Sequence, residues 1–309
     1  MVGRFRHRRW VRRTTEESFA RAFEALGHEV RRQEMAEGPE PARKAAGLFR
    51  PDWTLLSKDF DMRPSFVERL REAGARRVAH WHFDSMYALG KLRWYRKVAG
   101  ACDLALSKER GLFEKFRKWG LKPVYFDQGY DPEVIRPGIR RESLAGQVGF
   151  IGTFYKRNER IALLRAVARE FRLRVWSQKP ERYAAIGIDA QPAMFDEQVG
   201  DICASVDAVL GINITHEIEG YWSNRQYLIT GAGGFYICKY TPGLETVYEN
   251  RRHVVWFETV DEAVDLLRRY LSDEVERRRI ARAGHELARD RHTYLHRAGE
   301  IVRSLDSAV

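Results

Sequence analysis

Residues 206–238 read VDAVLGINITHEIEGYWSNRQYLITGAGGFYIC. The apolar run 206–212 predicts a buried strand, residues 223–231 follow as a helix, and residues 235–238 form a second short strand. A strand followed by a helix and another strand is typical of parallel sheets covered by helices on both faces. This unit therefore indicates an α/β fold for the chain around it.

The same alternation continues in both directions. We expect strands at 52–57, 77–83, 103–107, 123–126, 148–152, 173–176 and 253–257. We expect helices from Pro64 onward and at 88–99, 108–118, 158–170, 260–271, 273–288 and 292–306. Capping boxes Thr14–Glu17 and Thr259–Glu262 begin two helices, the first of which carries Phe19 and Phe23.

Residues 136–146 interrupt the alternation with proline, glycine and charge, so we place an interdomain linker there. The chain then divides into an N-terminal domain, residues 1–138, and a C-terminal domain, residues 139–309. The predicted fold class is α/β, with two Rossmann-like domains facing a cleft and the last helix returning to the N-terminal domain. Ligands of such folds bind beyond the carboxyl ends of the strands. Only Met1 to Gly3 precede the basic run, so either the first strand is a stub or the true start codon lies upstream.

Composition narrows the class of protein. The chain has 309 residues, 44% of them hydrophobic, without the run of about 20 apolar residues that a membrane helix needs. The N-terminal arginines are not followed by the apolar region of a secretory signal. The three cysteines, Cys102, Cys203 and Cys238, are scattered and predict buried thiols in a reducing compartment. We therefore expect a cytoplasmic protein that does not span a membrane.

The formal charge of +11 favours acidic partners such as nucleotide phosphates, nucleic acid or an anionic membrane surface touched peripherally. The alternative is that this charge reflects only an arginine-rich composition. Many of the arginines lie among glutamates on helices, where solvated faces are the usual role. The cluster of Arg4, Arg6, Arg8, Arg9, Arg12 and Arg13 is not diluted by acids and has Trp10 within it. It could follow a phosphate backbone.

Two segments are candidate phosphate sites. Ser223 or Asn224 can cap the helix 223–231, and Arg225 in its first turn can donate a bidentate pair of hydrogen bonds to a pyrophosphate. The other segment, 149–158, has a glycine-containing loop after a strand and is neither a P-loop nor a GxGxxG fingerprint. A plain turn is the competing interpretation. The residues assigned to the donor are Gly152, Thr153, Lys156, Arg157, Trp176, Ser223, Asn224, Arg225, Thr230, Gly231 and Glu245.

A polar cluster ends the strand 77–83. His80, His82 and Asp84 alternate and so share one face of the strand near its carboxyl end. Asp84 or His82 could act as general base towards an acceptor hydroxyl. Metal binding is an alternative, but no third histidine follows directly, and a purely structural role is a further one. We predict no metal site.

Four motifs in order, 152–157, Gly220-Tyr221-Trp222-Ser223-Asn224-Arg225-x-Tyr227, 233–235 and 292–297, resemble the CgeB-like, spore-maturation type glycosyltransferases of glycosyltransferase group 1. The resemblance covers most of residues 148–304. It implies a GT-B fold, a nucleoside diphosphate sugar bound by the C-terminal domain, Arg225 facing the donor phosphates, no cofactor, and transfer without an obligatory metal. The acceptor would be a glycan, a protein or a modified nucleic acid.

One position departs from the pattern of the group. Leu228 stands where these enzymes usually carry the glutamate that is expected to hold the nucleotide ribose. Glu245 or Glu219 could substitute for it. The departure also motivates a different class, a non-catalytic protein of the same fold that binds a nucleotide sugar or a glycan. A sugar-nucleotide epimerase shares the two-domain architecture, but the pattern from Trp222 to Arg225 argues against it.

Overall fold

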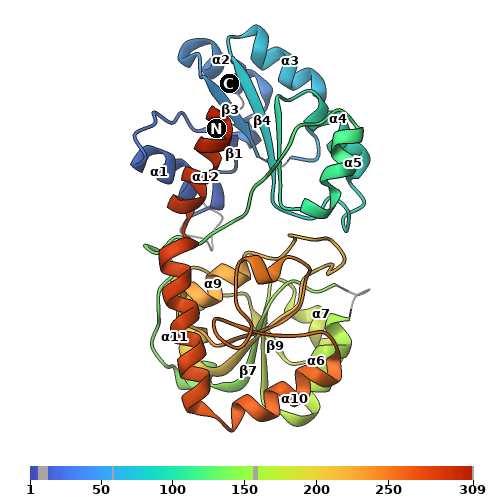
Figure 1. The fold of residues 1–309 in the computed structure, drawn as a ribbon, viewed down its shortest axis with the longest axis vertical. Coiled ribbons are helices and arrows are strands. Elements are labelled where there is room, and N and C mark those ends of the chain that lie inside the picture. The colour runs from blue at the N-terminus through green and yellow to red at the C-terminus, as the bar shows by residue number, and fades with distance from the viewer. Residues whose placement is uncertain (6–12, 58, 156–158, 308–309) are drawn as a thin grey trace. The chain divides into compact units, whose positions relative to one another are not determined.

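The computed structural model describes residues 1–5, 13–57, 59–155 and 159–307. Within them the chain forms two compact units (Figure 1). Unit 1 comprises Met1–Gln128, Ile218–Tyr221 and Tyr294–Val309, and unit 2 comprises Gly129–Glu217 and Trp222–Thr293. Each unit has its own parallel sheet and its own cores.

The sheet of unit 1 has the strand order β2-β1-β3-β4-β5-β6, with every pair parallel. Its strands are β1 (Val2–Gly3), β2 (Gln33–Glu34), β3 (Trp53–Leu56), β4 (Arg77–His82), β5 (Leu104–Ser107) and β6 (Pro123–Tyr125). Its helices are α1 (Thr15–Ala25), α2 (Pro39–Phe49), α3 (Pro64–Glu72), α4 (Leu92–Gly100), α5 (Phe113–Lys118) and α12 (Tyr294–Asp306).

Alternation along these strands builds a core on each face of the sheet. Leu55, Ala79 and Trp81 pack with α1 and α12 on one face, whereas Leu56 and Val78 pack with α2 and α3 on the other. Figure 1 shows α12 beside α1, far from it in sequence. The predicted return of the last helix to the N-terminal domain is therefore confirmed.

The sheet of unit 2 has the order β12-β11-β10-β7-β8-β9 and is also parallel throughout. Its strands are β7 (Gly146–Ile151), β8 (Leu173–Ser177), β9 (Ala190–Pro192), β10 (Val206–Gly211), β11 (Tyr236–Lys239) and β12 (Val255–Phe257). Its helices are α6 (Arg160–Glu170), α7 (Pro180–Ala184), α8 (Glu197–Ser205), α9 (Arg225–Gly231), α10 (Val260–Leu271) and α11 (Glu274–Arg291). The predicted α/β class with parallel strands is confirmed in both units.

Both capping boxes form as predicted. The hydroxyl of Thr14 accepts from the backbone N–H of Glu17 at 3.2 Å, and Thr259 does the same for Glu262 at 3.2 Å. Short 3₁₀ turns, at 35–37, 110–112, 142–144 and 244–246, complete the described secondary structure. One of them replaces the start of the helix predicted at 108–118, which begins as an α-helix only at Phe113. The helix predicted at 88–99 begins at Leu92.

Candidate functional site

Strands β7 and β10 lie side by side in the sheet of unit 2, although α6, β8, α7, β9 and α8 separate them in sequence. From β7 the chain builds outward through β8 and β9, then returns to β10 and builds in the opposite direction. The carboxyl ends of these two strands are therefore a topological switch point, where open α/β sheets bind their ligands. The loops after β7 and β10 are therefore expected to line a ligand site.

Arg225, the first residue of α9, joins these two strand ends. Its Nη1 donates to the carbonyl of Ile151 at 2.7 Å, and its Nη2 donates to the carbonyl of Ile212 at 2.7 Å. Its Nε donates to Oγ of Ser223 at 3.2 Å. A guanidinium carries five N–H groups, so two of them lack a partner among the described residues. Arg225 likewise forms no ion pair within that part of the chain.

A second arginine lies beside it. Arg160 is 2% exposed, and it donates to the carbonyl of Thr153 and, at 2.8 Å, to the same carbonyl of Ile212 that Arg225 uses. Burial lowers the pKa of Arg160 to about 10, and the positive charge of Arg225 adds to this shift. The sequence analysis missed Arg160, because it stands among charged residues at the start of a helix and looks solvated.

Gly152 makes room for the guanidinium of Arg225. A Cβ at this position would lie 2.6 Å from Nη1 of Arg225 and 2.7 Å from the ring of Phe150. Distances this short are not tolerated, so a side chain here would displace the arginine or the ring. The predicted donor residue Gly152 thus lies directly against Arg225.

The loop between β10 and α9 is held by a neutral histidine. The backbone N–H of Asn213 donates to Nε2 of His216 at 2.9 Å, so Nδ1 carries the proton towards the carbonyl of Tyr240 at 2.9 Å. Burial lowers the pKa of His216 to about 4. Oδ1 of Asn213 accepts from the backbone N–H of Ser223 at 2.9 Å. These bonds fix the start of α9, and with it Arg225.

The other predicted donor residues have packing partners. Trp176 is 1% exposed within the core, and the hydroxyl of Thr230 bonds Gln226 and Tyr248. A Cβ on Gly231 would lie 2.7 Å from the ring of Tyr130.

Asn224 precedes α9 without capping it through its side chain, and Glu245 is exposed and accepts from Tyr240 at 2.9 Å. Lys156 and Arg157 lie outside the described residues. Leu228 is half-buried against the core beneath α9.

In unit 1, His82 and Asp84 lie at the carboxyl end of β4. Nδ1 of His82 accepts from the backbone N–H of Asp84 at 3.2 Å. His82 is 1% exposed, under Phe60 and Trp94, and its ring stacks with that of His80. His80 is wholly buried, and this burial lowers its pKa to about 3, so it stays neutral. The structure thus brings His82 and Asp84 together through the backbone.

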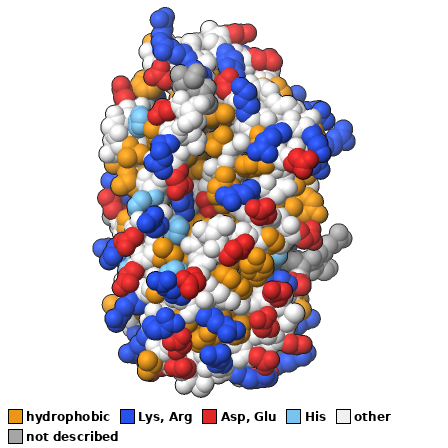
Figure 2. Space-filling view, in the orientation of Figure 1, with side chains coloured by type: hydrophobic (Ala, Val, Ile, Leu, Met, Phe, Trp, Pro, Cys, Tyr) orange, Lys and Arg blue, Asp and Glu red, His pale blue; other side chains and the backbone are white. Residues whose placement is uncertain are grey.

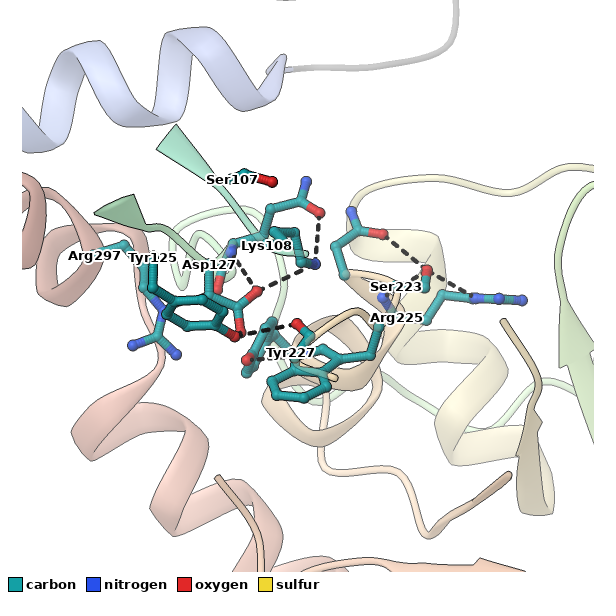
Figure 3. Close-up of polar contacts among 12 residues, drawn as sticks. Ser107, Lys108, Tyr125, Asp127, Ser223, Arg225, Tyr227 and Arg297 are labelled. Atoms are coloured by element: carbon teal, nitrogen blue, oxygen red, sulfur yellow. Dashed lines mark hydrogen bonds and ion pairs between the residues drawn. The ribbon is translucent and has the colours of Figure 1, made fainter. Parts of the chain in front are cut away.

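A buried charged network at the ends of β5 and β6 escaped the sequence analysis. Nζ of Lys108 lies 3.1 Å from Oδ1 of Asp127 and 3.3 Å from Oε1 of Gln128 (Figure 3). Burial lowers the pKa of Lys108, and the carboxylates of Asp127 and Asp84 oppose this shift. Nε of Arg297 donates to the carbonyl of Gln128 at 2.9 Å, which ties α12 to this network.

The same part of unit 1 binds the segment Ile218–Tyr221. The hydroxyl of Tyr125 donates to Asp127 at 3.2 Å and lies 3.3 Å from the carbonyl of Gly220. The N–H of Gly111 donates to the carbonyl of Glu219 at 3.1 Å. Gly220 has φ +78°, and a Cβ there would lie 3.0 Å from the carbonyl of Lys108. The segment therefore needs glycine at this position, both for its backbone conformation and for its packing.

Solved structures of similar fold include glycosyltransferases. HepE of Anabaena, solved in complex with UDP-glucose, superposes with a TM-score of 0.65 at 11% identity, over 93% of this chain and 89% of HepE. A glycosyltransferase from Rickettsia africae gives a TM-score of 0.68 at 8% identity, over 99% and 98% of the two chains. AviGT4, a glycosyltransferase of avilamycin A biosynthesis, gives 0.61 at 16% identity, over 94% and 88%.

The fold is GT-B. Residues 157–303 match the family model described as glycosyl transferase-like, so this part of the chain holds a domain similar to that family. That domain contains Arg160, Arg225 and both strands that follow α9. No curated protein has a sequence that matches this chain. The narrower CgeB-like subtype stays a prediction.

None of the helices in the described ranges is long and apolar enough to cross a lipid bilayer. Within those ranges, no group of three or more histidine, cysteine, aspartate or glutamate side chains is arranged to hold a metal ion.

Proposed function

We propose that this protein transfers a glycosyl group from a nucleoside diphosphate sugar to a hydroxyl acceptor. The observation that carries the proposal is Arg225, a cation at the switch point of the sheet that has no ion-pair partner in the described part of the chain and two N–H groups to spare. A diphosphate supplies both a counter-charge and acceptor oxygens. HepE was solved with UDP-glucose, which makes a uridine nucleotide the first donor to test.

The chemistry requires positive charge at this place. As the bond between the anomeric carbon and the diphosphate oxygen breaks, the departing nucleoside diphosphate gathers negative charge, which fixed cations stabilise. A new bond forms between that carbon and the acceptor oxygen, whose proton passes to a base. Lys156, Arg157 and Ser223 are proposed as further donor contacts. We propose transfer without an obligatory metal, the arginines serving as the electrophilic groups.

Asp84 is proposed as the general base, with His82 as the residue that orients it. Asp84 lies at the carboxyl end of β4 and is half-buried, whereas the ring of His82 is enclosed. Asp84→Asn should lower kcat by at least about 100-fold, the usual contribution of a general base, and leave donor affinity unchanged. An Asp84→Asn enzyme with the wild-type kcat rules the assignment out.

The proposal is tested by a thermal-shift screen against UDP-, GDP-, ADP-, CMP- and TDP-linked sugars, with the free nucleotides as controls. A ligand that binds only the folded state raises Tm by mass action. A shift with one nucleotide series, followed by slow hydrolysis of that donor in the absence of acceptor, supports transfer. The acceptor, a glycan, a protein or a modified nucleic acid, is then sought with the labelled donor.

A non-catalytic protein of the same fold is the second candidate, and Leu228 favours it. A half-buried leucine cannot accept a hydrogen bond from the ribose hydroxyls. Such a protein would show a nucleotide-dependent shift in Tm but no donor hydrolysis at any enzyme concentration. No shift with any nucleotide, on folded protein, contradicts both candidates.

A further inference from the structure

Helices α4 and α5 of unit 1 carry a concentrated positive charge. Residues 91–122 are all described, and their exposed Lys and Arg side chains are Lys91, Arg93, Arg96, Lys97, Arg110, Lys115, Arg117, Lys118 and Lys122. Glu114 is the one exposed acid in this range, and it pairs with Lys118 at 2.8 Å. Asp103 pairs with Arg71, and Glu109 is buried. The exposed charge of this range is therefore strongly positive.

Several of these cations share one surface. Arg93, Arg96 and Lys97 follow a spacing of three and four residues, so they share one face of α4. Arg96 then reaches Trp119, just after α5, with its guanidinium 5.5 Å from the ring centroid. Nζ of Lys115 lies 5.3 Å from the same ring. In Figure 2, blue side chains gather at the upper right, where Figure 1 places α4 and α5.

Part of this charge has no counter-charge among the described residues. Among the described residues, Arg93, Lys97 and Lys122 form no ion pair, and they are exposed. At the amino end of α4, the ring of Phe60 is 38% exposed, with Nζ of Lys91 at 5.3 Å from its centroid. The surface thus combines cations that attract an anion with aromatic rings at its border.

We propose that the α4–α5 face, defined by Arg93, Arg96, Lys97, Lys115, Trp119 and Lys122, docks on a bilayer that contains anionic phospholipids. Charge complementarity selects an anionic partner. Cations lie over the ring of Trp119, so the ring offers no open platform for stacking a nucleic-acid base. Tryptophan and phenylalanine beside lysine and arginine suit the headgroup region, where aromatic rings and cations meet lipid phosphates.

The test is co-sedimentation of the full chain with vesicles of phosphatidylcholine alone or of phosphatidylcholine mixed with phosphatidylglycerol. We expect binding to the mixed vesicles only, lost at about 1 M salt, where the screening length falls to roughly 3 Å. The variant Arg93→Gln/Lys97→Gln/Lys122→Gln should weaken binding on the order of 100-fold, about 5-fold for each cation near the surface. These side chains make no ion pair in the described part of the chain, so the variant should fold.

A matched control removes as many charges elsewhere. Arg140, Arg282 and Arg291 of unit 2 are exposed and form no ion pair with described residues. Their triple change to Gln should leave vesicle binding within about 2-fold, because the effect is local rather than one of net charge. Equal losses in both variants overturn the proposal. So does absent vesicle binding, or tighter binding of duplex DNA or single-stranded RNA that the α4–α5 variant abolishes.

Discussion

Arg225→Ala is the substitution that most directly tests the candidate donor site. It removes a guanidinium whose spare N–H groups would meet the donor phosphates, and charge-assisted hydrogen bonds of this kind contribute about 1.5–3 kcal/mol. We therefore expect Kd for UDP to rise about 10- to 150-fold. The fold should lose about 1–3 kcal/mol, because the carbonyl of Ile151 loses its donor, whereas that of Ile212 keeps Arg160.

The assay is titration calorimetry with UDP and UDP-glucose, on protein whose folding has been checked by its unfolding transition. Arg165→Ala is the matched control, since Nη2 of Arg165 also donates to a backbone carbonyl, that of Ile186 at 3.3 Å, away from the switch point. Arg225→Lys keeps the charge but cannot reach two carbonyls. Its Kd for UDP should therefore lie between the values of the wild-type protein and of Arg225→Ala. An unchanged Kd in a folded Arg225→Ala protein refutes the assignment.

Three further outcomes are expected. Gly152→Ala should weaken UDP binding as Arg225→Ala does, because the new Cβ would lie 2.6 Å from the guanidinium; wild-type Kd contradicts this. Lys108→Met should cost about 3–5 kcal/mol in urea unfolding, by leaving Asp127 buried without its cation, and the double change Lys108→Met/Asp127→Leu should cost less. The folded-state pKa of His216, about 4, lies below its ordinary value of 6.5, so stability should be lost as pH falls through this window, by up to roughly 3 kcal/mol. His216→Gln should flatten that part of the pH profile, and an unaltered slope would speak against it.

Periodicity predicted the parallel core of the fold because buried strands in α/β proteins are continuous apolar runs. The strand predicted at 206–212 is β10, Val206–Gly211, and that at 148–152 overlaps β7, Gly146–Ile151. Elements without such a run were missed. Strand β2 is two polar residues, Gln33–Glu34, and helix α2 holds two prolines and a glycine, which weaken its pattern. These elements form through their tertiary contacts.

The candidate site was predictable only in part. The sequence predicted Arg225 as a site residue because it follows an unusual loop. Its partners are the backbone carbonyls of Ile151 and Ile212, and no residue type marks such a carbonyl in the sequence. The pairing of Lys108 with Asp127, in contrast, could have been predicted from the sequence. Each residue follows a predicted strand directly, and β5 and β6 are parallel neighbours whose carboxyl ends meet.

Arg160 and Arg225 together argue for an anion more strongly than either does alone. Arg160 and Arg225 donate to one carbonyl, that of Ile212, so two like charges are held together where burial already opposes them. The pKa of Arg160 falls to about 10 as a result. For stability alone, one arginine beside an apolar residue would supply the hydrogen bond to the carbonyl of Ile212 without burying a second charge. A doubly charged diphosphate at the switch point would remove the repulsion and use the spare N–H groups of Arg225, so its binding should raise Tm more in the wild-type protein than in Arg160→Met.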